Sequence, residues 1–104
     1  MTQAELFAEL KKLNMPVTYS HFTKPPGLPY LVYRRAESDD LIADNQNYKS
    51  VTGYDVELYT EKIDLLVEKY VEDKLKELRL PYSKIGVWIE SEELYMIRYG
   101  ITLT

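Results

Sequence analysis

Cysteine is absent from this 104-residue chain, and histidine occurs once, at position 21. Without cysteine, the chain can form no disulfide, no thiolate metal site and no cysteine nucleophile. A single histidine, with no carboxylate beside it in the sequence, gives neither a hydrolytic triad nor a zinc site. We therefore expect a structural role for His21.

Long apolar runs and catalytic motifs are missing as well. No stretch approaches the roughly 18 apolar residues that span a bilayer, and the N-terminal residues mix charged and apolar positions instead of forming a signal-peptide core. There is no glycine-rich phosphate loop, no G-x-S-x-G turn and no run of metal ligands. These absences predict a protein of an aqueous compartment that is not an enzyme and uses no metal or other cofactor.

The composition that remains is that of an ordinary soluble globule, with 45% apolar and 29% charged residues. A chain of this length predicts a single domain, residues 1–104, whose core buries roughly 60–70% of the surface of the unfolded chain. The net charge of −4 is concentrated in the middle, because residues 37–61 hold seven acidic side chains and one lysine. Nucleic-acid binding needs clustered lysine and arginine, so we expect no specific nucleic-acid partner.

Hydrophobic periodicity and helix caps predict seven elements. Thr2 and Glu5 match a capping box ahead of Leu6 and Leu10, which predicts a helix over residues 3–13. A second helix is predicted over residues 62–79, where apolar side chains recur at helical spacing. Alternating or β-branched residues predict a short extended piece and four longer strands, at residues 17–22, 30–37, 48–60, 82–91 and 94–103.

This order, α-β-β-β-α-β-β, predicts an α+β fold with a mostly antiparallel sheet and both helices packed on one face. On the long strand before the second helix, Tyr54, Val56 and Leu58 are expected to face the core, with Asp55 and Glu57 on the polar side. The residues predicted to be buried together are Leu66, Val67, Tyr70, Val71, Ile97, Tyr99 and Ile101.

An acidic segment, ESDDLIADNQNY at residues 37–48, joins two of the predicted strands. A calcium loop of the EF-hand type is excluded because the ligand spacing and the central glycine are missing. Acid–base catalysis needs a carboxyl in an apolar pocket, whereas these groups crowd into a polar segment. Two interpretations stay open, a solvated connection and a loop that faces a partner or a lumen. The candidate residues are Glu37, Asp39, Asp40, Asp44 and Asn45.

Aromatic and charged clusters elsewhere are weaker signals. Ten tyrosines and Trp88 are many for this length, and a surplus on strand faces would suit subunit contact. Arg34 and Arg35 are neighbours in a strand, so they point to opposite faces, and we expect one of them to meet an acidic side chain. The acidic cluster of Glu90, Glu92 and Glu93 is interpreted as solubilising.

Taken together, several segments resemble small tail-completion proteins of long-tailed phages and prophages of Gram-positive bacteria, including tail-terminator or head-to-tail joining proteins. The segments are HFTKPPGLPYLVY (21–33), ESDDLIADNQNY (37–48), VELYT (56–60) and IESEELYMIRY (89–99). The resemblance covers nearly the whole chain, and its strings are structural rather than catalytic.

The resemblance implies a subunit of a ring, usually of six, at the head-proximal end of the tail tube, assembled in the host cytoplasm and retained in the virion. Its implied partners are further copies of itself, the tail tube protein and the head connector proteins. An acidic lumen would let DNA pass without binding, which would suit the acidic segment. Two other classes stay open, a monomeric adaptor or inhibitor module and a hydrolase with an unfamiliar acid pair.

Overall fold

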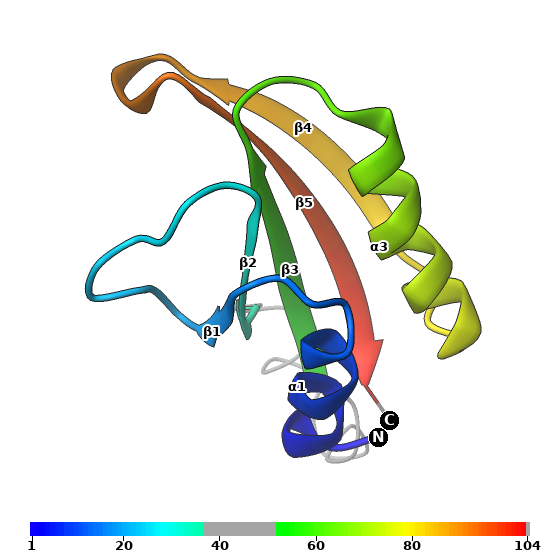
Figure 1. Cartoon of the computed structure of the whole chain (residues 1–104). Helices are drawn as coiled ribbons and strands as arrows, with labels where there is room; N and C mark the ends of the chain where they lie inside the picture. Colours follow the sequence, from blue (N-terminus) through cyan, green and yellow to red (C-terminus); the bar gives the residue numbers. More distant parts are fainter. Residues whose placement is uncertain (37–51, 104) are drawn as a thin grey trace, which may run out of the picture.

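The computed structural model describes residues 1–36 and 52–103, which contain two α-helices and five strands (Figure 1). The helices are α1 (Gln3–Lys11) and α3 (Leu65–Glu77). The strands are β1 (Val17–Tyr19), β2 (Tyr30–Arg35), β3 (Thr52–Thr60), β4 (Ser83–Ile89) and β5 (Leu94–Leu103), with the short 3-10 turn η2 (Glu90–Glu92) between the last two. The predicted α+β class and element order are confirmed.

The strands form one sheet in the order β1-β2-β3-β5-β4. The three pairings among β2, β3, β5 and β4 are antiparallel, as predicted, while β1 runs parallel to β2. The parallel pair arises because the chain returns to the start of β2 through residues 20–29, where Pro25, Pro26 and Pro29 interrupt regular structure. The sheet is therefore mixed, with β1 and β4 at its two edges.

Local signals set the helix boundaries. At α1 the capping box is complete, since Thr2 Oγ1 accepts from Glu5 N at 3.1 Å and Glu5 Oε1 accepts from Thr2 N at 2.8 Å. At α3 the side chain of Asp64 caps the backbone N–H of Val67. This cap starts α3 at Leu65, three residues later than predicted.

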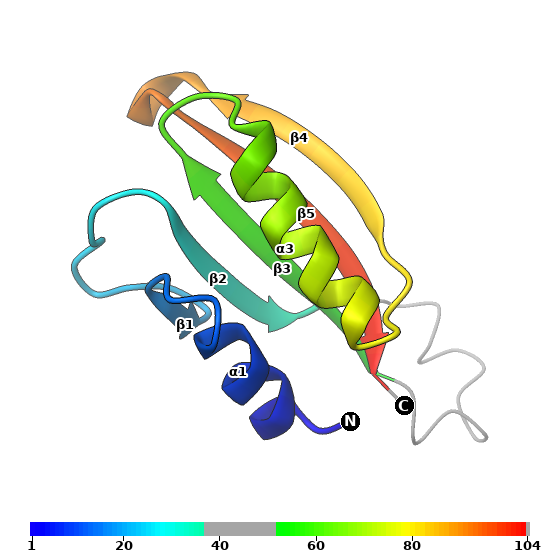
Figure 2. The same cartoon turned by 45° about the vertical axis from the view of Figure 1, so that its right-hand side comes forward.

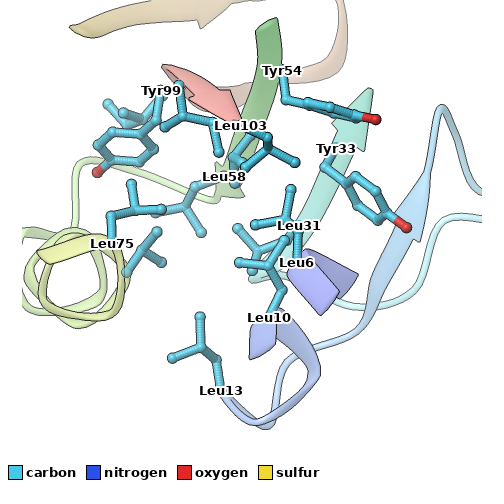
Figure 3. Close-up of a cluster of buried hydrophobic side chains, with 14 residues drawn as sticks. Leu6, Leu10, Leu13, Leu31, Tyr33, Tyr54, Leu58, Leu75, Tyr99 and Leu103 are labelled. Carbon is cyan, nitrogen blue, oxygen red and sulfur yellow. The ribbon is translucent and has the colours of Figure 1, made fainter. Parts of the chain in front are cut away.

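Both helices cover the same face of the sheet, and the core lies between them and the strands (Figures 1 and 2). Figure 3 shows Leu6 and Leu10 of α1 and Leu75 of α3 meeting side chains of the central strands. The strand residues of this cluster alternate along each strand, as a half-buried sheet requires. They are Leu31, Tyr33, Tyr54, Val56, Leu58, Ile97, Tyr99, Ile101 and Leu103.

The predicted apolar stripe of α3 is only partly correct. Val71 and Leu75 are fully buried and Val67 packs against the core, but Leu66 is 81% exposed and Tyr70 is 48% exposed. Leu66 precedes Val71 by five residues, which places the two side chains about 140° apart around the helix. The buried arc of α3 is narrower than the sequence pattern indicated.

Candidate functional site

The acidic residues proposed from the sequence, Glu37, Asp39, Asp40, Asp44 and Asn45, lie outside the described residues. The sites that the structure does describe are two charged clusters and two exposed apolar surfaces.

The first cluster ties the edge strand β4 to α3. Lys84 Nζ lies 2.9 Å from Glu68 Oε1 and 2.7 Å from Glu72 Oε2. Two tyrosine hydroxyls, those of Tyr99 at 2.8 Å and Tyr82 at 3.3 Å, also donate to Glu72. Glu68 is 5% exposed, so its charge is neutralised inside the protein by a lysine from another element.

These contacts fix the ionisation of the cluster. Burial alone would raise the pKa of Glu72, but the hydrogen bonds from Lys84 and Tyr99 outweigh burial and hold this pKa below its ordinary value. The same bonds, from Glu72 first and Glu68 second, raise the pKa of Lys84. Burial, reinforced by Glu72, raises the pKa of Tyr99. At neutral pH Glu72 is therefore a carboxylate that pairs with the Lys84 ammonium group.

The second cluster lies on the opposite face of the sheet, around Glu57. Its carboxylate accepts from Arg34 Nη2 at 2.9 Å, from Arg98 Nε at 3.3 Å and from the Tyr59 hydroxyl at 2.9 Å. Burial, then the bond to Glu57, raises the pKa of Tyr59. Glu57 is 3% exposed, so the expectation of a solvent-facing side chain at this position is wrong.

The register of the sheet explains this burial. Arg98 of β5 is the direct cross-strand partner of Glu57. On the other side the partner is Val32, and Arg34 follows Val32 by two residues on the same face of β2. The guanidinium groups of both arginines therefore reach the Glu57 carboxylate. The expectation that one of the arginine pair meets an acidic neighbour is correct for Arg34. The sequence alone carried no signal for the second partner, because Arg98 is distant along the chain.

The chemistry of both clusters is that of ion pairing. The two glutamates of the first cluster converge on Lys84 rather than on an open cleft, and Glu57 is saturated by three donors. Within residues 1–36 and 52–103, no group of three or more His, Asp or Glu side chains is placed to hold a metal ion. His21 is exposed, with Nδ1 at 3.2 Å from Ser20 Oγ.

The first exposed surface, which we call the α3 apolar surface, consists of large side chains at and just before the start of α3. They are Ile63 (62% exposed), Leu65 (71%), Leu66 (81%) and Tyr70 (48%). Two of these residues, Leu66 and Tyr70, were predicted to be buried, and that prediction is wrong. Isolated exposed apolar residues are normal, but Leu66 and Tyr70, four residues apart, lie on the same side of α3. Ile63 and Leu65 are their neighbours along the chain at the start of the helix, and exposed apolar residues gathered in this way are typical of interaction sites.

The second exposed surface, which we call the β4 edge, is the outer strand of the sheet. Ile85 and Val87 are 57% and 41% exposed on the face away from the helices, and Trp88 is 49% exposed. Beyond β4 the turn Glu90–Glu93 projects past the rest of the sheet (Figure 1). Glu90 accepts a hydrogen bond from Trp88 Nε1 at 2.7 Å, so one member of the acidic cluster has a partner that the sequence did not indicate.

Neither described helix is long and apolar enough to cross a membrane. Comparison with known proteins gave no matching family model, no matching curated protein and no matching solved structure.

Proposed function

We propose that this protein is a structural component of a phage or prophage tail, acting in tail completion or head-to-tail joining, and that it is not an enzyme. It acts as a subunit of a ring, of six in the assemblies that it resembles, at the head-proximal end of the tail tube. The resemblance of its segments to such proteins supports this role. The observation that carries the proposal is the α3 apolar surface.

The α3 apolar surface is costly for a protein that works alone. Ile63, Leu65 and Leu66 expose most of their area to water, and burying each fully would contribute roughly 1.5–3 kcal/mol. The core does not need these side chains, because Val71 and Leu75 already close it from α3. A subunit that meets other proteins in a permanent assembly gains from such a surface, since obligate interfaces are the more apolar class.

The acidic segment has a separate place in the proposal. Glu37, Asp39, Asp40, Asp44 and Asn45 face either the genome-carrying lumen or a neighbouring subunit. In the lumen, the carboxylates would repel phosphate and let DNA pass. The protein thus assembles in the host cytoplasm, remains in the virion tail and meets the tube protein and the head connector proteins without binding DNA itself.

Leu66→Gln tests the α3 apolar surface with little risk to the fold, because Leu66 is 81% exposed. We expect this variant to have the same free energy of unfolding as the wild type. It should no longer form rings or bind isolated tail tubes, and negative-stain electron microscopy shows both. Lys69→Gln is the matched control, since Lys69 lies on the same helix with a side chain that is 71% exposed. It should assemble normally.

Normal ring formation and normal infectivity of a phage that carries Leu66→Gln would contradict the proposed role of this surface. A wild-type protein that stays monomeric beside intact tail tubes at every concentration would favour the monomeric adaptor instead. The gene neighbourhood gives an independent check. A position between head-connector genes and the tail-tube gene is expected, and a metabolic operon would count against the proposal.

A further inference from the structure

The β4 edge leaves the sheet open on one side. Among the strands of the described residues, β4 pairs only with β5, and six of its seven residues are exposed. Folded proteins usually guard a long edge strand with proline, bulges or outward charges, because its free N–H and C=O groups can pair with another chain. β4 has no proline, and Lys84, its one charged residue, is bound to Glu68 and Glu72 of α3. The other edge, β1, has only three residues.

We propose that a second copy of this chain covers the β4 edge. In the free protein, β4 lies antiparallel to β4 of the second copy, and the two sheets join across a two-fold axis close to Gly86. The same surface serves both partners in such a contact, so it must be complementary to itself.

The side chains of β4 meet this requirement. With Gly86 at the axis, antiparallel pairing places Ile85 of each copy opposite Val87 of the other, on the face away from the helices. These two side chains are 57% and 41% exposed in the single chain, and directly opposed apolar pairs stabilise a sheet. On the face toward the helices, Lys84 stands opposite Trp88 of the second copy. No pair joins two like charges.

The charges at the two ends of β4 select the antiparallel direction. Lys76 and Arg79, which precede β4, are exposed, as is Glu77 between them, whose carboxylate pairs with Lys74 at 2.9 Å. Glu90, Glu92 and Glu93, which follow β4, are exposed as well. Antiparallel pairing sets the basic beginning of each strand beside the acidic end of the other. Parallel pairing would join like charges at both ends. Pairing of β4 with β1 of the second copy is disfavoured because β1 offers only three residues for backbone hydrogen bonds.

This inference goes beyond the proposed function and does not depend on it. A two-fold pair has no polarity, whereas a ring stacked on one end of a tube is polar. The pair is therefore a form of the free protein that shields the β4 edge before assembly. Failure of the ring experiment would leave the pair intact, and absence of the pair would leave the ring proposal standing.

Two single-cysteine variants test the pairing directly, because the natural chain has no cysteine. The Ile85→Cys and Val87→Cys proteins are mixed and mildly oxidised. The yield of disulfide-linked dimer should be several-fold higher in this mixture than in either variant oxidised by itself. Directly opposed strand residues fall within the Cα separation that a disulfide allows. A mixture of Thr18→Cys and Val87→Cys proteins reports on the alternative contact between β4 and β1. Higher cross-linking in this mixture than in the Ile85→Cys and Val87→Cys mixture would overturn the proposal. Background cross-linking in both mixtures would overturn it as well.

Sedimentation of uncross-linked protein supplies a second measurement. The wild type should form dimers that weaken as salt is raised, since the end-to-end charge contacts are exposed. Val87→Lys should be a folded monomer by circular dichroism and sedimentation, because an edge lysine blocks strand pairing. Thr18→Lys, on the same face at the other edge of the sheet, should dimerise like the wild type. A wild type that stays monomeric throughout the concentration series, or a dimeric Val87→Lys protein, would overturn the two-fold pair.

Discussion

At the scale of single residues, the structure depends on buried carboxylates that cations from other elements neutralise. Lys84 is the clearest case, because it is the only cation in ion-pair contact with Glu68 and Glu72 among the described residues. Removing one partner of a buried ion pair leaves an uncompensated charge, which is far more costly than losing a surface pair.

We expect Lys84→Gln to lower the free energy of unfolding by about 2 kcal/mol at pH 7. This is less than a fully buried pair would lose, because the side chain of Lys84 is 39% exposed and water partly screens it. Denaturant unfolding measures the change. Lys12→Gln, which removes a lysine with a 64% exposed side chain paired to Glu9, is the control and should change stability little.

The pH dependence of this loss has a definite sign. The pKa of Glu72 is lower in the folded protein than in the unfolded chain, so its stabilising contribution is present above the unfolded pKa and is lost as pH falls through the folded pKa. The difference in free energy of unfolding between the wild type and Lys84→Gln should therefore be at its maximum at pH 7 and should decrease below about pH 4. A difference that is constant across this range would show that Lys84 acts through packing alone.

At the scale of elements, α3 shows which buried residues could be predicted from the sequence and which could not. Val71 was expected in the core and lies there, fully buried. Leu66 and Tyr70 fit the same helical pattern and are exposed, because the pattern does not say how wide an arc the sheet can cover. The burial of Glu57 could not be predicted from the sequence either. It depends on the register of the sheet, which brings Arg34 of β2 and Arg98 of β5 into contact with the Glu57 carboxylate.

Val71→Asp tests the buried side of α3. The change would place an unpaired charge at a position with no exposed area, and we expect a loss of several kcal/mol, on the order of the whole stability of a small domain. Thermal and denaturant unfolding should show a largely unfolded variant. Leu66→Asp is the matched control on the same helix and should stay folded. Similar losses for the two variants would mean that α3 does not pack as described.

At the scale of the whole molecule, the net negative charge opposes binding to DNA. The chain carries a net charge of −4, and many of its described cations are engaged in ion pairs. A protein with several phosphate contacts binds DNA non-specifically with a Kd of roughly 10⁻⁴ to 10⁻⁶ M at physiological salt. We expect no binding in this range, measured by fluorescence anisotropy of a labelled duplex. Binding that weakens steeply with added salt would contradict this expectation.

Replacing Asp39, Asp40 and Asp44 by asparagine separates DNA repulsion from subunit contact. The change removes three negative charges and nearly conserves side-chain volume, so circular dichroism should show wild-type folding. If these carboxylates line the lumen, a phage with the triple variant should assemble complete tails but eject its genome more slowly, because phosphate is repelled less. If they contact a neighbouring subunit, ring assembly itself should fail. Normal assembly together with normal ejection would leave the segment as a solvated connection between β2 and β3.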